Sequence, residues 1–146
     1  MSKLRAGVVG AGAFGRIHAR KYAEGTRVQF VGVYDPDDER ASQLADTHGA
    51  TSFANLDALL NAADIITIAS PPSFHGATAR RALEAGKHLL IEKPLATDTE
   101  TGAALVRLAH EKKLVVACGH QERLVFDAMG LLSAPETPTH IESVRE

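Results

Sequence analysis

The sequence predicts an α/β fold, in which helices cover both faces of one doubly wound parallel β-sheet. Two observations support this class. Short apolar runs alternate with segments of helical periodicity, as they do in chains built from β-α-β units. The runs are continuously apolar, which is typical of parallel strands that are buried on both faces. With 146 residues, the chain is long enough for one such domain.

Five apolar runs are predicted strands, and a sixth run is weaker. In chain order they are RAGVVG at 5–10, QFVGVYD at 29–35, the weak ATSF at 50–53, DIITIAS at 64–70, KHLLIE at 87–92 and LVVACG at 114–119. Helices are predicted between them, over residues 14–23, 37–47, 55–60, 73–85 and 98–113. Ligands are expected at the carboxyl ends of the strands, because open parallel sheets bind them there.

Turn and capping residues support these helices. Gly25, Gly49 and Gly86 stand where helices are expected to end, since glycine readily adopts the left-handed conformation of a helix C-terminus. The segment TDTE at 97–100 has the pattern of a capping box. Ser73 is a candidate N-cap for the helix that follows it.

Three glycines follow the first predicted strand and match the pattern G-x-G-x-x-G: Gly10, Gly12 and Gly15. The first permits a tight turn, the second leaves room for a pyrophosphate beside bare backbone, and the third lets the helix pack closely on the strand, as in a Rossmann-type sheet. The phosphates would bind N–H groups at the positive end of the helix, where Ala13 and Phe14 stand. Taken alone, the pattern also fits a glycine-rich turn that binds nothing.

Asp35 follows the second predicted strand and lies 20 residues beyond Gly15. A carboxylate at about this spacing accepts hydrogen bonds from the ribose hydroxyls of an adenosine and repels a 2′-phosphate, which favours NAD over NADP. Asp35 would alternatively cap the next helix, with Pro36 at its first position, and the two roles are compatible. Arg40 is a candidate phosphate partner and leaves NADP open.

Two loops after later strands carry unusual residues. The loop SPPSFH at 70–75 contains two prolines, which forbid helix or ladder pairing and hold it rigid. The segment EKPLA at 92–96 places an acid and a base directly after a buried strand. Lys93, if desolvated there, would hydrogen-bond a substrate oxygen and assist proton transfer. A structural salt bridge between Glu92 and Lys93 explains the same pattern.

The segments GAGAFG, SPPSFH and above all AGKHLLIEKPLA, together with Asp35, resemble the N-terminal half of a known family. This is the glucose-fructose oxidoreductase, inositol dehydrogenase and rhizopine-catabolism family, usually written Gfo/Idh/MocA. The resemblance implies an NAD(P)-dependent oxidoreductase that acts on a hydroxyl or carbonyl carbon of a sugar, cyclitol or related small molecule.

The same resemblance implies roles for individual residues. It places Ser70, Pro71 and His75 along the cofactor. It places Glu92, Lys93 and Pro94 beside the nicotinamide and the substrate, with Lys93 as the catalytic residue. The complete predicted cofactor-binding set is Gly10, Gly12, Ala13, Phe14, Gly15, Asp35, Ser70, Pro71, His75, Glu92, Lys93 and Pro94.

The resemblance also sets the expected domain organisation. Residues 1–120 are expected to form the NAD(P)-binding domain, and residues 121–146 the hinge and first elements of an incomplete α+β substrate domain. The apolar stretch ERLVFDAMGLL needs a partner surface, and a strand predicted from Thr139 would be an exposed edge, which natural proteins avoid. We therefore expect this chain to bind cofactor without turning over substrate alone, and the full-length protein to be a homo-oligomer.

Composition argues against several other classes. The net charge of −2 gives no electrostatic reason to expect nucleic acid or a membrane as a partner. The single cysteine, Cys118, cannot form an intrachain disulfide and indicates a reducing, cytoplasmic location. Seven histidines occur without an H-E-x-x-H motif, so no metal site is expected. Of these, His18 is expected to be a partly exposed helix residue rather than a cofactor contact.

Two functions remain after these exclusions. The first is the oxidoreductase described above. The second is a non-catalytic NAD(P)-binding module, such as a redox sensor or regulatory subunit. Lys93 within an intact E-K-P segment favours the oxidoreductase, because a module that only binds dinucleotide has no evident use for a cation beside the nicotinamide.

Overall fold

The computed structural model describes residues 3–130 and residue 132. At its centre lies a six-stranded sheet in the order β3-β2-β1-β4-β5-β6, with parallel neighbours throughout. The strands are β1 (Leu4–Val9), β2 (Val28–Tyr34), β3 (Thr51–Ser52), β4 (Ile65–Ile68), β5 (His88–Ile91) and β6 (Val116–Cys118). This order is that of a Rossmann-type doubly wound sheet, so the predicted fold class is confirmed.

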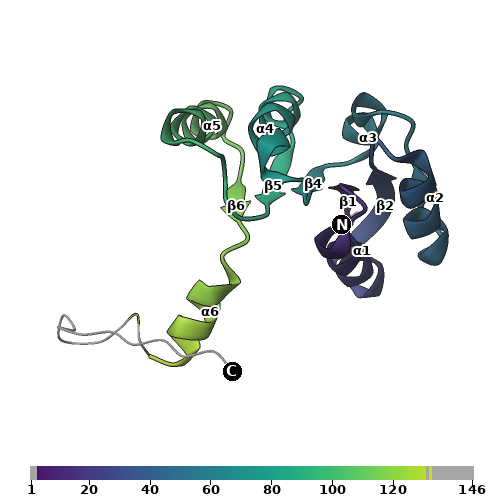
Figure 1. Ribbon diagram of the computed structural model, residues 1–146, viewed down its shortest axis with the longest axis horizontal. Coiled ribbons are helices and arrows are strands. Elements are labelled where there is room, and N and C mark those ends of the chain that lie inside the picture. Colours follow the sequence, from purple (N-terminus) through teal and green to yellow (C-terminus); the bar gives the residue numbers. More distant parts are fainter. Residues whose placement is uncertain (1–2, 131, 133–146) are drawn as a thin grey trace.

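Helices pack on both faces of this sheet. These helices are α1 (Ala13–Glu24), α2 (Asp38–Thr47), α3 (Leu56–Ala62), α4 (His75–Glu84) and α5 (Thr99–Glu111), and a 3₁₀ turn lies at Pro72–Phe74. A sixth helix, α6 (Gln121–Ala128), follows β6. In Figure 1, α3, α4 and α5 lie on one side of the sheet and α1 on the other. The buried cluster under α3, α4 and α5 includes Leu59, Leu83 and Leu105, and each such leucine stabilises the fold by roughly 1.5–3 kcal/mol.

The strand order reverses between β1 and β4, whose following loops therefore run to opposite sides of the sheet. Backbone hydrogen bonds align the ends of these strands with their neighbours. The N–H of Gly10 donates to the carbonyl of Tyr34 at 2.8 Å, and the N–H of Ala69 donates to the carbonyl of Val9 at 2.8 Å. The carboxyl ends of β1, β2 and β4 thus meet at one edge, where a crevice is expected.

Two predicted helix starts are wrong by one or two residues. Helix α2 begins after Asp37, whose carboxylate accepts from the N–H of Arg40 at 3.0 Å, so Pro36 does not hold the first helical position. Helix α5 is capped by Asp98 instead of the first residue of TDTE. Asp98 is the N-cap in place of Thr97 because its two carboxylate oxygens accept hydrogen bonds from the N–H and the hydroxyl of Thr101, at 2.7 and 2.8 Å.

The prediction that Ser73 caps the next helix is also wrong. Residues Pro72–Phe74 form a 3₁₀ turn, and α4 begins only at His75, without a side-chain cap. The helix start shifts because the proline, with φ already fixed, is suited to the first position of such a turn.

Figure 1 shows that helix α6 leaves the sheet after β6. The helix has no buried residue. Its exposed apolar side chains include Leu124 and Val125. The domain boundary at residue 120 stays a prediction, and the strand expected from Thr139 lies outside the described residues. Among residues 3–130 and 132, no helix has both the length and the apolar character required to cross a membrane.

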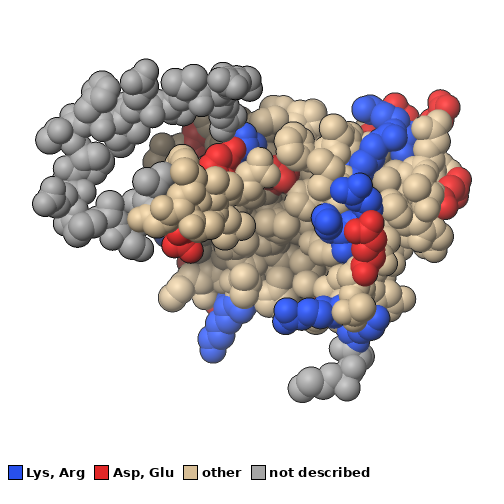
Figure 2. Space-filling model, turned by 90° about the horizontal axis from the view of Figure 1, so that it is seen from below, with Lys and Arg blue, Asp and Glu red and all other residues tan. Residues whose placement is uncertain are grey.

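Charged side chains do not gather into a single basic surface on the face shown in Figure 2. Some lysines and arginines lie beside aspartates or glutamates there, those along the lower edge of the view do not, and the middle of the face is uncharged.

Candidate functional site

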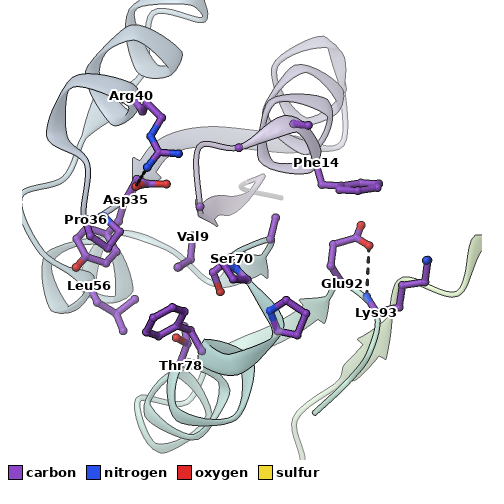
Figure 3. A pocket seen from close by; sticks show the side chains of 18 of the residues that line it. Val9, Phe14, Asp35, Pro36, Arg40, Leu56, Ser70, Thr78, Glu92 and Lys93 are labelled. Atoms are coloured by element: carbon purple, nitrogen blue, oxygen red, sulfur yellow. Dashed lines mark hydrogen bonds and ion pairs between the residues drawn. The ribbon is translucent and has the colours of Figure 1, made fainter. Parts of the chain in front are cut away.

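A cavity of about 820 Å³ lies at the carboxyl ends of β1, β2, β4 and β5. This volume is within the range of roughly 300–1,000 Å³ that is usual for small-molecule and cofactor sites. The residues that line it are Val9, Gly10, Gly12, Ala13, Phe14, Tyr34, Asp35, Pro36, Arg40, Leu56, Ala69, Ser70, Pro71, Pro72, Phe74, Thr78, Arg81, Glu92 and Lys93. Figure 3 shows the cavity with Asp35 and Arg40 at one end and Phe14, Glu92 and Lys93 at the other.

Each glycine of the turn after β1 has its own structural reason. Gly10 has a φ of +101°, and a Cβ there would lie 2.8 Å from the backbone of Ala69 and Ser70. A Cβ at Gly15 would overlap the carbonyl oxygen of Gly10, so this glycine lets α1 pack against the turn. A Cβ at Gly12 would meet no atom within 4 Å. Its open surroundings belong to the cavity.

The first turn of α1 presents backbone N–H groups at the cavity. Its N-cap, Gly12, has no side chain to cap the helix, and Ala13 and Phe14 line the cavity. The first hydrogen bond inside the helix runs from Arg16 N–H to the carbonyl of Gly12, at 3.0 Å. An uncapped helix N-terminus that opens into a cavity is suited to an anion such as a phosphate.

Asp35 is held rigidly at the end of β2. Its side chain is buried, and its two oxygens accept from the N–H groups of Ala11, at 2.7 Å, and Asp37, at 2.9 Å. Arg40 lies 3.8 Å from one of these oxygens and 2.8 Å from the carboxylate of Asp37. Hydrogen bonds from Arg40 hold the pKa of Asp37 below its ordinary value. Each oxygen of Asp35 keeps a further lone pair for a ligand hydroxyl.

Ser70 stands at the centre of the cavity lining, after β4. Its Oγ atom is buried and has no hydrogen-bond partner among the described residues. Buried hydroxyls in proteins are nearly always paired. An unpaired one at a cavity wall fits a ligand that supplies the missing partner.

Glu92 and Lys93 follow β5 at the other end of the cavity. The ion-pair partner of Glu92 is His18 of α1, with Oε1 and Nε2 2.7 Å apart, while Lys93 contributes only its backbone N–H, at 3.4 Å. In the part of the chain that the structure describes, no carboxylate lies within 4.0 Å of the Lys93 ammonium. The alternative of a structural Glu92–Lys93 salt bridge is therefore wrong, and Lys93 is exposed at the cavity.

Three of the predicted cofactor residues lie outside the cavity lining: Gly15, Pro94 and His75. The ring of His75 is fully buried, and its two nitrogens lie 2.7 Å from the carbonyl oxygen of Pro94 and 2.8 Å from that of Ser70. Because the ring is enclosed between these two loops, it joins the loop after β4 to the loop after β5. The proline loop before His75 was recognised from the sequence, but nothing in the sequence indicated that His75 contacts Pro94.

Replacing His75 with alanine is expected to lower the free energy of unfolding by about 2–4 kcal/mol, through the cavity it leaves and the carbonyls it strands. The same substitution at His110, which is exposed on α5, should cost less than about 0.5 kcal/mol. Urea unfolding of both variants measures the difference. Equal losses for the two would show that His75 does not join the loops.

Other lining residues were missed by sequence reasoning. Thr78 and Arg81 of α4 and Leu56 of α3 reach the cavity, although no motif marks them. His18 is the partly exposed helix residue that was expected, but its ion pair with Glu92 was not predicted. Its position one helical turn after Phe14, a predicted contact, was the available signal. Among the described residues, no group of three or more metal-ligating side chains comes together.

Comparison with known proteins identifies relatives of this arrangement. A family model described as an oxidoreductase family with an NAD-binding Rossmann fold matches residues 4–120. UDP-N-acetylglucosamine 3-dehydrogenase of Acidithiobacillus ferrooxidans is 44% identical over 124 residues, which are 85% of this chain and 39% of that protein. Inositol 2-dehydrogenase of Corynebacterium glutamicum is 40% identical over 119 residues, 78% of this chain and 35% of that protein.

Solved structures agree with these matches. UDP-N-acetylglucosamine 3-dehydrogenase GnnA from Acidithiobacillus ferrooxidans has a TM-score of 0.84 at 42% identity, covering 92% of this chain and 44% of its own. GenD2 from gentamicin A biosynthesis, solved in complex with NAD, has a TM-score of 0.78 at 32% identity, covering 82% of this chain and 35% of its own. The chain thus spans less than half the length of these relatives.

Proposed function

The chain belongs to the Gfo/Idh/MocA oxidoreductase family and carries its NAD-binding Rossmann domain, and we propose that it is the cofactor-binding part of an NAD(P)-dependent oxidoreductase. The reaction is hydride transfer between the nicotinamide and a hydroxyl or carbonyl carbon of a sugar, cyclitol or related small molecule. The observation that carries the proposal is one cavity with a buried carboxylate at one end and, at the other, a lysine that has no carboxylate within 4.0 Å among the described residues.

The residues of the cavity fit an extended dinucleotide. In the proposed arrangement Asp35 accepts from the ribose hydroxyls of the adenosine, and the N–H groups at Gly12, Ala13 and Phe14 bind the pyrophosphate. The unpaired Oγ of Ser70 and the backbone of Pro71 lie along the middle. The open space at Gly12 supports this placement, because the phosphates need bare backbone there.

NAD is the preferred cofactor in this proposal. The fixed carboxylate of Asp35 would repel the 2′-phosphate of NADP. Arg40 remains the candidate partner for that phosphate, since it is already within 3.8 Å of Asp35.

Lys93 is the proposed catalytic residue. When bound, the nicotinamide accepts or supplies the hydride, and the protein has to orient the substrate oxygen and stabilise its changing charge. The Lys93 ammonium, exposed at the cavity, would donate a hydrogen bond or a proton to that oxygen. Pro94 and Glu92 would fix the loop from which Lys93 projects.

The substrate and the assembly remain proposals as well. A polyol or carbonyl compound would enter from the Lys93 end, against a wall contributed by sequence beyond this domain. We further propose a cytoplasmic location, supported by the single cysteine, and a homo-oligomer, supported by the family resemblance.

Calorimetric titration of the 146-residue chain with NAD⁺, NADH and NADP⁺ tests the cofactor part of this function. Saturable binding of one NAD⁺ or NADH per chain, tighter than that of NADP⁺, is expected. Failure of all three to bind would contradict the proposal. Binding without turnover, in every context tried, would favour the non-catalytic module instead.

The role of Lys93 is tested in a chimera that joins residues 1–120 of this chain to the C-terminal part of the 44% identical relative. Lys93→Met is expected to lower kcat by a factor of about 10² to 10⁴, the usual loss when a proton-transfer group is removed, with little change in NAD⁺ affinity. Lys112→Met, at the exposed end of α5, is the matched control. An unchanged kcat in the Lys93 variant would exclude a catalytic role.

A further inference from the structure

The pair formed by His18 and Glu92 lies at one end of the cavity. Asp35 follows β2, on one side of β1, whereas Glu92 follows β5, two strands away on the other side. Figure 3 shows the two carboxylates at opposite ends of the lining. A dinucleotide whose adenosine ribose binds Asp35 therefore has its nicotinamide on the Glu92 side.

The carboxylate of Glu92 is held in one orientation. Its side chain is 15% exposed and that of His18 is 19% exposed, so water competes weakly for their 2.7 Å contact. The Glu92 N–H donates to the carbonyl of Ile68 at 2.9 Å. On the far side, a Cβ at Gly119 would lie 3.0 Å from Oε2, so β6 closes against the carboxylate.

Few other charges of the described residues face this pair. From β5 the neighbour is Lys93, which contacts Glu92 through its backbone. From β6 it is Cys118, whose pKa is raised by burial and further by the charge of Glu92, so the thiol stays neutral. Arg16 and Arg20 of α1 line a groove against α2 and lie on another side of the helix. The protonation of His18 therefore decides whether the pair carries no net charge or one negative charge.

We propose that His18 is a positioning residue for Glu92, and that the pair favours the oxidised cofactor over the reduced one. This inference rests on the proposed function. The nicotinamide ring of NAD⁺ carries a positive charge, and that of NADH is neutral. A fixed, poorly solvated carboxylate beside the ring stabilises only the charged form, because charge interactions are strong where water is excluded.

The preference also depends on pH in this arrangement. A protonated imidazole offsets the carboxylate, and a neutral one leaves its negative charge uncompensated. The ratio of the NAD⁺ affinity to the NADH affinity is therefore expected to rise with pH.

The test is a set of calorimetric titrations of the full 146-residue chain with NAD⁺, NADH and ADP-ribose, the last of which lacks the nicotinamide. Glu92→Gln keeps the shape of the side chain and removes its charge. It should therefore weaken the binding of NAD⁺ about tenfold relative to that of NADH, equivalent to about 1.4 kcal/mol. ADP-ribose binding should be unchanged. Glu111→Gln, at an exposed site on α5, makes the same change in net charge and should leave the ratio unaltered.

His18→Gln is the second variant, because glutamine still donates to Glu92 but cannot take up a proton. It should keep the NAD⁺ preference and lose the pH dependence of the ratio. If His18 has only a structural role, the His18→Gln variant will change the affinities for all three ligands together and leave the pH dependence of the NAD⁺ to NADH ratio intact. That result would overturn the proposal. So would an unchanged NAD⁺ to NADH ratio in Glu92→Gln while ADP-ribose still binds. Absence of ADP-ribose binding to the unaltered chain would overturn the proposed function itself, and this inference with it.

Discussion

Gly12→Ala is expected to leave the fold intact and to weaken dinucleotide binding about a hundredfold, which corresponds to about 2.7 kcal/mol. The added methyl group meets no protein atom within 4 Å, so nothing in the folded chain has to move. It would occupy the space through which the pyrophosphate approaches bare backbone at the start of α1. Thermal unfolding and calorimetric titration with NADH measure the two effects separately.

The matched control is Gly15→Ala, which adds the same methyl group three residues later. There the Cβ overlaps the carbonyl oxygen of Gly10, and backbone cannot yield as a flexible side chain does. We expect a loss of about 3 kcal/mol or more in the free energy of unfolding. If Gly12→Ala binds NADH as tightly as the unaltered chain, the glycine turn is not the phosphate site.

Asp35→Ala is expected to weaken NAD⁺ binding at least about a hundredfold and NADP⁺ binding by less than about tenfold. Two hydrogen bonds to a charged acceptor are lost with NAD⁺, each of about 1.5–3 kcal/mol. With NADP⁺ the loss is offset, because removal of the carboxylate also removes its repulsion of the 2′-phosphate. Arg40, which lies 3.8 Å from Asp35, becomes available to that phosphate.

Two further variants keep this test interpretable. Asp38→Ala removes an exposed carboxylate from the first turn of α2 and should change neither affinity beyond about twofold. Asp35→Asn retains an acceptor oxygen for one of the two N–H groups, of Ala11 or of Asp37, so it should disturb the fold less than alanine does. An equal loss of NAD⁺ and NADP⁺ affinity in Asp35→Ala would contradict the ribose role.

Much of this architecture is encoded locally and was predictable. The continuously apolar runs predict a buried parallel sheet, because strands that are buried on both faces need apolar side chains at every position. The turn at Gly10 and the close approach at Gly15 require a residue without a side chain at those positions. Asp35 follows β2 directly, so its place at the strand end follows from the strand itself.

The unpredicted features depend on contacts between distant segments. His18 and Glu92 are 74 residues apart, and His75 bridges to Pro94 across 19 residues. Periodicity carries no information on which loop a buried histidine will meet. Helix starts were misplaced for a different reason: neighbouring residues such as Thr97 and Asp98 are both good caps, and the choice depends on hydrogen bonds that only the folded chain reveals.

The same distinction explains the uneven prediction of the cavity. Asp35, Ser70, Glu92 and the glycine turn were identified, but the strand-end residues Val9 and Tyr34 were not, and neither were the helix residues Leu56, Thr78 and Arg81. These three helix residues reach the cavity from the sides of helices α3 and α4. The apolar periodicity of a helix predicts which of its side chains are buried, but it does not predict which of them line a cavity.

The central claim is that one nicotinamide dinucleotide spans the cavity from Asp35 to Lys93. Amide chemical-shift mapping of the 146-residue chain by NMR, during titration with NADH, tests it most directly. We expect the amides of Gly12, Ala13 and Phe14, of Asp37, whose N–H donates to Asp35, and of Lys93 to shift together along one binding curve, whereas ADP-ribose should shift all of them except Lys93. Shifts confined to the Asp35 end with NADH, or scattered over the helices, would contradict the claim.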